Sequence, residues 1–153
     1  MVIFNEKYKF AFNMNEPYKE LKREGYSILG INDVQAERVL HAFVSLDSSN
    51  RIKHTIVLMK DATYSNESEY KKAIDQNIVN MVRMGYTIVN SYHMTFTNGR
   101  TAEKVIYETN GKKLCFIVAG VHGVLVGSST LIQAEGDEFD KELSSVFASM
   151  TEF

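Results

Sequence analysis

Apolar residues recur every three or four positions in two segments of the chain, which is the spacing of one helix face. The first segment covers Asn66–Met84. Asn66 can cap its start, Glu69 follows three residues later as in a capping box, and Gly85 can end it in a left-handed conformation. The second segment covers about Asp137–Met150, with acidic residues in its first turn that suit the helix dipole. The pattern predicts two main helices.

Between these helices apolar and polar residues alternate, which is the pattern of half-buried β-strands. Two sequences typical of tight hairpin turns, Asn98-Gly99 and Asn110-Gly111, divide this region. We expect four strands here: Tyr86–Thr97, Arg100–Thr109, Lys112–Ala119 and Val124–Leu131.

A further hairpin is predicted upstream, where Arg38–Leu46 and Arg51–Met59 flank the turn at residues 47–50. If Leu46 opposes Ile52, then Val44 opposes His54. Weaker patterns indicate strands over Tyr8–Asn13 and Tyr26–Ile31, with a short helix over Pro17–Arg23 between them.

Two-residue turns would fix which residues face one another across the strands. With Asn98-Gly99 as such a turn, Met94 opposes Glu103 and Tyr92 opposes Val105. With Asn110-Gly111 as the next, Val105 opposes Phe116. This register collects one strongly apolar face and one mixed face, and the mixed face carries three residues capable of chemistry: His93, Lys104 and Cys115.

The strand over residues 112–119 is apolar on both faces, as suits a strand covered on both sides. Two amphipathic helices and a mostly antiparallel sheet predict an α+β fold, specifically an α/β/α sandwich. Neither a linker rich in Pro, Gly or Ser nor an internal repeat divides the sequence. We therefore expect a single domain over residues 1–153.

Composition narrows the classes of function. The chain has 153 residues, of which 44% are hydrophobic and 24% charged, and its formal net charge is −2. These values favour a packed core over disorder, and we expect no nucleic-acid partner because the charge is near neutral. A single cysteine excludes an intramolecular disulfide framework and a multi-cysteine zinc site.

The apolar residues of the chain also bear on its compartment. The N-terminal apolar run stops at Asn5, where a secretory signal would continue for about 7–15 apolar residues. The longest apolar stretch, Leu114–Val126, is interrupted by two glycines and a histidine, and a membrane span needs about 20 residues. We expect a cytoplasmic protein without a membrane span.

The side chains that carry catalysis or bind metals are dispersed. The four histidines, His41, His54, His93 and His122, do not share the spacing of a metal site, so we predict no metal and no cofactor. Cys115 and His93 share a face in the expected register but lie two strands apart and diagonal, roughly 10 Å or more from each other. This favours a buried, inert Cys115 over a nucleophile.

Glycines 120, 123 and 127 are spaced as neither a dinucleotide fingerprint nor a phosphate-binding P-loop. We interpret them as belonging to a turn and a bulge. Ser128-Ser129-Thr130 lacks the G-x-S-x-G context of a hydrolase nucleophile. The sequence therefore predicts no catalytic residue.

The order of these expected elements resembles that of a known family. Two segments carry the resemblance: the strand-turn-strand sequence from Tyr92 to Tyr107, and the closing helix that ends in Phe147-Ala-Ser-Met150. Together they resemble the PsbP-like superfamily over roughly residues 24–153. The superfamily includes an extrinsic photosystem II subunit and a yeast Ran-binding nuclear-transport protein. The resemblance implies an α/β/α sandwich that acts by binding, without a shared catalytic residue.

The leading functional hypothesis is a non-enzymatic domain that binds another protein. The expected contacts are the polar hairpin tips, which carry Asn50, Arg51, Asn98 and Arg100. One alternative is a small-ligand-binding protein or enzyme that uses a cleft between a helix and the mixed sheet face, near His93, Lys104 and Cys115. Another is an immunity or inhibitor protein. A homo-oligomer is compatible with each hypothesis.

Overall fold

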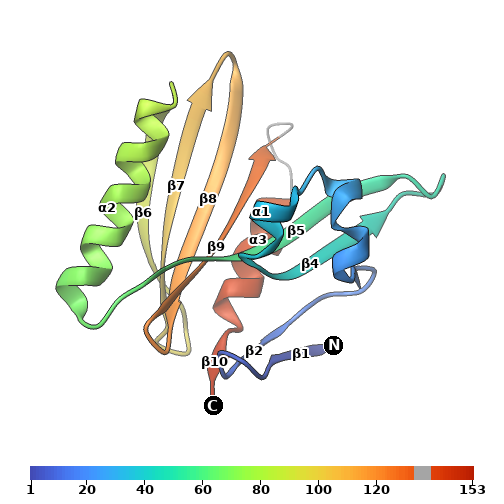
Figure 1. Cartoon of the computed structure of the whole chain (residues 1–153), viewed down its shortest axis with the longest axis horizontal. Coiled ribbons are helices and arrows are strands. Elements are labelled where there is room, and N and C mark those ends of the chain that lie inside the picture. The colour runs from blue at the N-terminus through green and yellow to red at the C-terminus, as the bar shows by residue number, and fades with distance from the viewer. Residues whose placement is uncertain (133–138) are drawn as a thin grey trace.

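The computed structural model describes residues 1–132 and 139–153, whose strands form two antiparallel sheets (Figure 1). The larger sheet has seven strands in the order β3-β4-β5-β9-β8-β7-β6. These are β3 (Lys19–Glu20), β4 (Val39–Leu46), β5 (Ile52–Thr63), β6 (Thr87–Thr95), β7 (Thr101–Thr109), β8 (Lys112–Val121) and β9 (Val124–Ile132). The smaller sheet has the order β1-β2-β10. Its strands are β1 (Val2–Asn5), β2 (Phe10–Asn13) and β10 (Thr151–Glu152).

Helices cover both faces of the larger sheet (Figure 1). Helix α2 (Glu67–Arg83) packs on one face, and α3 (Phe139–Ala148) packs on the other, beside the smaller sheet. A 3-10 helix, η1 (Arg23–Leu29), and a short α1 (Asp33–Ala36) connect β3 to β4. The predicted α+β sandwich with a mostly antiparallel sheet is confirmed.

The ends of α2 follow the predicted signals. The Asn66 side chain accepts a hydrogen bond from the Glu69 amide at 3.0 Å, so Asn66 is the N-cap. The Glu69 carboxylate in turn accepts from the amide of Ser65 at 2.7 Å. Gly85 has a φ of 95°, a conformation that glycine adopts without strain and that stops the helix.

Two apolar layers form because β8 is buried on both faces, as predicted. On the α2 side, five sheet residues pack against the apolar stripe of the helix: Val105, Tyr107, Phe116, Val118 and Leu125. On the α3 side, a second layer includes Ile117, Ala119 and Val126 from the sheet. The expected stripe of α3 is buried there through Leu143, Val146, Phe147 and Met150. The first two residues of the helix predicted from Asp137 lie outside the described residues.

The two Asn-Gly turns differ in conformation. At Asn110-Gly111 both residues have positive φ, 48° and 76°, so the turn contains two residues and Val105 opposes Phe116 as predicted. At Asn98-Gly99 only Gly99 has positive φ, and the Phe96 amide donates to the Arg100 carbonyl. This turn therefore contains three residues.

The longer turn changes the register between β6 and β7 by one residue. Tyr92 opposes Lys104, and Met94 opposes Ala102, where the sequence had predicted Val105 and Glu103. Because side chains alternate between the faces of a sheet, the shift moves every side chain in Asn90–Thr95 to the face opposite the predicted one.

Three predictions upstream are also wrong in detail. Leu46 does oppose Ile52, but a bulge between Ser45 and Leu46 places Ser45, instead of Val44, opposite His54. The expected strand from Tyr26 is the 3-10 helix η1, and the expected helix from Pro17 contains the short strand β3. In the second case pairing with β4 overrides the local pattern.

Candidate functional site

The last strand of the larger sheet, β6, has one free edge. Among residues 1–132 and 139–153, it pairs with β7 on one side and with no strand on the other. Eight of its nine residues are exposed, and Met94 is half-buried. Its sequence contains no proline and no lysine, the residues with which proteins commonly protect such an edge from other strands. A further extended segment could pair with this edge.

The backbone groups that face the open edge can be identified from the turn. Because the Phe96 amide donates to Arg100, the pairs Met94–Ala102 and Tyr92–Lys104 also exchange hydrogen bonds with β7. The residues between them, Ser91, His93 and Thr95, direct their amides and carbonyls outward. The Ser91 amide donates to the neighbouring Asn90 side chain at 2.9 Å, as an outward amide can.

A bulge between Ile88 and Asn90 limits the regular part of the edge. The uninterrupted ladder runs over Asn90–Thr95, six residues. Exposed apolar side chains lie along β6 and at the preceding end of α2: Val82, Met84, Ile88, Val89 and Tyr92. The open edge thus combines apolar surface with backbone groups that no strand of the described residues pairs with.

A cleft of about 710 Å³ lies between α2 and the nearby strands. From the helix side it is lined by residues that include Tyr70, Lys71 and Asp75. From the sheet side His93 and Glu103 line it, and His93 Nδ1 lies 2.5 Å from the Glu103 carboxylate. The register shift places His93 directly opposite Glu103, on the sheet face that α2 covers.

Tyrosine hydroxyls supply the cleft with further polar groups. Tyr64 and Tyr70 pack edge to face with ring centres 5.2 Å apart. Burial raises the pKa of Tyr70 to about 12, and burial also raises the pKa of Tyr64. Both phenols therefore stay protonated at neutral pH and can donate hydrogen bonds. Within residues 1–132 and 139–153, no hydrogen bond joins His93 to the hydroxyl of Ser91 or Thr101.

The structure does not bring together the three residues of the predicted ligand cleft. His93 shares a face with Glu103 and lines the cleft. Lys104 and Cys115 belong to the opposite face, where Lys104 Nζ lies 5.8 Å from the centre of the Tyr92 ring. Cys115 is buried, as predicted. The cause of the separation is the three-residue turn, which reverses the face on which His93 lies.

Asn98 and Arg100, expected at an exposed contact tip, bind the C-terminal segment of the same chain. The Asn98 side chain donates to the Ala148 carbonyl at 2.8 Å. Arg100 Nε donates to the Met150 carbonyl at 2.5 Å, and its Nη2 pairs with Glu152 at 2.9 Å. The Arg100 side chain is only 18% exposed. These contacts attach the β6–β7 turn to the end of α3.

Asn50 and Arg51, the other predicted contacts, lie at the far end of the β4–β5 hairpin, which projects from the molecule (Figure 1). The Arg51 side chain is 80% exposed and lies 3.8 Å from Asp47. Asn50 has a φ of 60° and forms part of the turn. This tip is a solvent-exposed turn, and its role as a contact surface stays a prediction.

His41 has a structural environment that the sequence did not reveal. Its ring is buried, with Nδ1 2.7 Å from the Glu20 carboxylate and Nε2 3.0 Å from the side-chain nitrogen Nδ2 of Asn5. Rings of Phe10, Phe12 and Phe43 surround it. Among the described residues, no three His, Cys, Asp or Glu side chains gather as metal ligands would.

Two strand glycines allow close approaches that the sequence analysis had not interpreted. A Cβ at Gly120 would lie 2.1 Å from the Tyr64 hydroxyl, and one at Gly127 would lie 2.2 Å from the Asp61 carboxylate. Gly123 does lie in the predicted turn, with a φ of 75°. A bulge is present too, but it lies in β5 between Lys60 and Ala62. Glycines inside strands, Gly120 and Gly127, were the sequence signal from which these close approaches of Tyr64 and Asp61 could have been predicted.

No protein-family model matches the sequence, and no curated protein matches it either. The fold, however, is similar to the solution structure of cyanobacterial PsbP (CyanoP) from Synechocystis sp. PCC 6803. The TM-score is 0.61 at 13% sequence identity, over 100% of this chain and 92% of that one. The chain therefore has a PsbP-like fold, as the resemblance of its elements predicted. In the part of the chain that the structure describes, no helix has the length and apolar character needed to span a membrane.

Proposed function

We propose that this chain is a non-enzymatic protein-binding domain, and that its partner adds an extended strand to the open edge of β6. The observation that carries the proposal is that edge: nine residues long, exposed at eight of them, and unpaired on one side. Strand addition uses such an edge because the backbone amides and carbonyls of the partner satisfy the unpaired groups. The cytoplasmic location expected from the sequence remains part of the proposal.

The geometry also defines the segment that would bind. Its ladder would extend over Asn90–Thr95 and stop at the bulge after Ile88, so a run of about six extended residues fits. Apolar side chains at one end of that run would cover Val89 and Met84, which are exposed. A hollow of about 320 Å³, lined in part by Gly85, Thr87 and Val89, can receive one of them.

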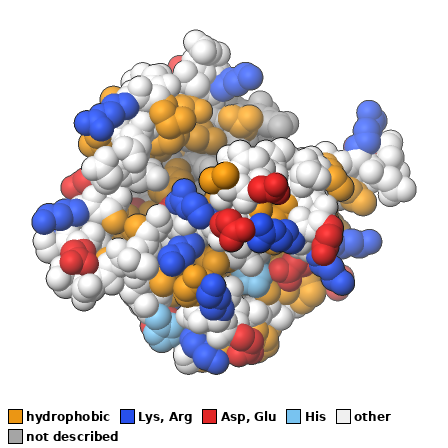
Figure 2. All heavy atoms as spheres, in the orientation of Figure 1, with side chains coloured by type: hydrophobic (Ala, Val, Ile, Leu, Met, Phe, Trp, Pro, Cys, Tyr) orange, Lys and Arg blue, Asp and Glu red, His pale blue; other side chains and the backbone are white. Residues whose placement is uncertain are grey.

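Charge complementarity has a small part in this proposal. The β6 strand itself carries no Lys, Arg, Asp or Glu. On the face shown in Figure 2, acidic and basic side chains are interspersed among the described residues. Backbone pairing and apolar contact would therefore supply most of the affinity, and salt should weaken the complex little.

Photo-crosslinking in the source cell tests the proposal. A photoreactive phenylalanine analogue replaces Tyr92 on β6 in one variant and Asn50 at the hairpin tip in another. We expect the Tyr92 position to give an adduct with a different protein. Adding Ser91→Pro should abolish that adduct, because proline removes an outward amide, whereas Ser91→Ala should retain it.

Three results would overturn the proposal. The first is a Tyr92 adduct that Ser91→Pro leaves unchanged. The second is an adduct formed only from the Asn50 position, which would assign partner binding to the hairpin tip. The third is an adduct composed of two copies of this chain, which would make the edge a homo-oligomer interface.

A further inference from the structure

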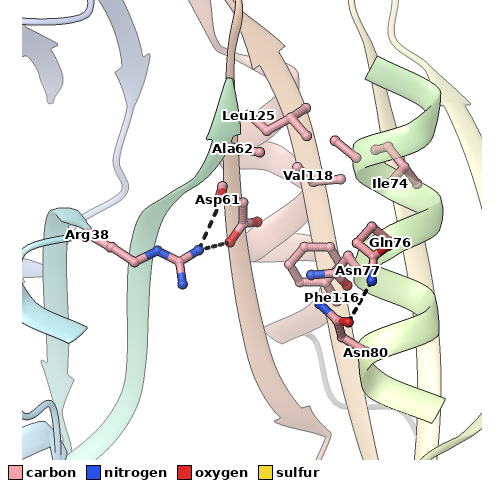
Figure 3. Close-up of a pocket in the computed structure, with 11 residues that line it drawn as sticks. Arg38, Asp61, Ala62, Ile74, Gln76, Asn77, Asn80, Phe116, Val118 and Leu125 are labelled. Atoms are coloured by element: carbon pink, nitrogen blue, oxygen red, sulfur yellow. Dashed lines mark hydrogen bonds and ion pairs between the residues drawn. The ribbon is translucent and has the colours of Figure 1, made fainter. Parts of the chain in front are cut away.

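A second cavity, of about 300 Å³, lies between α2 and strands β5, β8 and β9 (Figure 3). It is separate from the open edge of β6 and has a different lining from the cleft around His93. Its apolar part is formed by six side chains: Ala62, Ala73, Ile74, Phe116, Val118 and Leu125. Its polar part is formed by residues from β5 and α2 that point toward one another (Figure 3).

Asp61 enters this cavity from the bulge in β5. The bulge leaves Asp61 without a partner residue on β9, between the pairs Lys60–Val126 and Ala62–Leu125. Its carboxylate lies against the backbone of Gly127, where any larger residue would collide with Oδ2. One carboxylate oxygen, Oδ1, pairs with Arg38 Nη2 at 3.2 Å. The other, Oδ2, is buried and has no hydrogen-bond partner among the described residues.

Asn77 enters the same cavity from α2. Its side-chain oxygen, Oδ1, is also buried and without a hydrogen-bond partner in the described part of the chain. The neighbouring Gln76 and Asn80 differ, because Gln76 Nε2 donates to Asn80 Oδ1 at 2.8 Å. Two acceptors that lack donors therefore line one cavity, although buried polar atoms nearly always have partners.

We propose that this cavity binds a small organic molecule that carries a protonated primary amine on an apolar body. An ammonium group has three N–H donors and no acceptor, so it carries enough donors for both Asp61 Oδ2 and Asn77 Oδ1. The apolar body would pack on Phe116, Val118 and Leu125. Arg38 keeps its contact with Oδ1, and its side chain is 53% exposed, so water screens its repulsion of the ligand.

The cavity volume agrees with this class of ligand. Sites for small molecules begin at about 300 Å³, are mostly apolar and contain few polar groups. A carboxylate ligand would bring a second negative charge next to Asp61 and could donate to neither orphan oxygen, so it would be disfavoured. A neutral alcohol has one donor and would satisfy at most one of the two oxygens. The site should therefore select for the ammonium group.

Binding of 2-phenylethylamine, followed by NMR titration at pH 7, tests the inference against 2-phenylethanol, which has the same apolar body. We expect saturable shifts of the Gly127 and Asn77 signals with the amine, and at least tenfold weaker binding of the alcohol. Asp61→Asn and Asn77→Ala should each weaken amine binding at least tenfold. Circular dichroism would verify that both variants fold.

Asp75→Asn is the matched control, because Asp75 is an exposed carboxylate on the same helix that lines the other cleft. It removes the same charge as Asp61→Asn and should leave amine affinity unchanged. Equal affinity for amine and alcohol, absence of saturable amine binding, or unchanged affinity in a folded Asp61→Asn variant would overturn the inference. So would an equal loss in Asp75→Asn, which would place the amine in the cleft beside His93.

Discussion

The two edges of the seven-stranded sheet are built in opposite ways. At one edge β3 contains only Lys19–Glu20, and the buried His41 joins Glu20 to Asn5 of β1. At the other edge β6 is nine residues long, almost entirely exposed and free of proline and lysine. Short, charged or covered edges prevent pairing with other chains. The contrast shows that one edge of this sheet is protected, whereas on β6 a single bulge is the protecting feature found among the described residues.

The stability of the molecule should depend on the closed edge far more than on the open one. The closed edge contains a buried hydrogen-bond network surrounded by aromatic rings. The open edge contains exposed side chains and a contact between the exposed His93 and the half-buried Glu103. The exposed side chains of β6 can therefore be replaced with little effect on folding as long as its backbone hydrogen bonds to β7 are kept, which suits a surface used for binding.

The largest expected effect is at the closed edge. His41→Ala should lower the free energy of unfolding by about 4 kcal/mol, because it leaves a cavity among three phenylalanines and unpairs Asn5 and Glu20. The matched control at the open edge, His93→Ala, should change it by less than about 0.5 kcal/mol. Urea denaturation measures both, and similar losses for the two variants would refute the contrast between the edges.

Proline substitutions compare the two sides of β6 itself. Tyr92→Pro removes an amide that bonds to β7 and should lower the free energy of unfolding by about 3 kcal/mol. Ser91→Pro removes an outward amide and should cost about 1 kcal/mol, mostly from the fixed φ of proline. Thermal unfolding of both variants measures the difference. A larger loss for Ser91→Pro would mean that the outward and inward residues are assigned the wrong way round.

The two hairpin tips predicted as contacts should also differ in their contribution to stability. Arg100→Met breaks hydrogen bonds to the Met150 carbonyl and to Glu152, so it should lower the free energy of unfolding by about 2 kcal/mol. Arg51→Met should have almost no effect, since its side chain is 80% exposed. Chemical denaturation measures both variants. If both unfold at the wild-type midpoint, the contacts of Arg100 with Met150 and Glu152 do not stabilise the fold.

The smallest effect is expected at Asp61 in the interior strand β5, and it concerns the pH dependence of the free energy of unfolding. Burial raises the pKa of Asp61, and Arg38 only partly opposes this. The folded state then holds the Asp61 proton more tightly than the unfolded chain does. The contribution of Asp61 to stability is therefore present below its unfolded pKa, about 3.9, and is lost as pH rises through its raised folded pKa. The advantage of Asp61→Asn over wild type should grow across that interval, and parallel stability profiles for the two proteins would contradict this.

Local signals in the sequence predicted most of the fold. The capping residues around α2 and the positive φ values at Asn110-Gly111 depend on a few neighbouring residues, so pattern alone located them. At Asn98-Gly99 the same dipeptide led to a wrong prediction of a two-residue turn, because the dipeptide alone does not determine whether a turn contains two or three residues. Here the tip is held by contacts of Asn98 and Arg100 with the distant end of α3.

The candidate sites were less predictable because they depend on long-range packing. The open edge depends on strand order, and a sequence does not reveal that β6 ends the sheet. The cavity at Asp61 depends on a bulge in β5 and on the close approach of Asp61 to Gly127, and the network at His41 joins residues 36 positions apart. The single turn error also moved His93 to the wrong face, which separated the predicted cleft from the observed one.

Residue-resolved amide exchange, measured by NMR on the chain alone and with the crosslinked partner added, tests strand addition at β6 most directly. In the free chain the outward amides of Ser91, His93 and Thr95 should exchange fast, and those of Tyr92 and Met94 slowly, because only the latter bond to β7. Partner binding should slow exchange at the three outward amides. A bound partner that leaves those amides unprotected, while protecting the Asn50–Arg51 tip or another surface, would contradict the account.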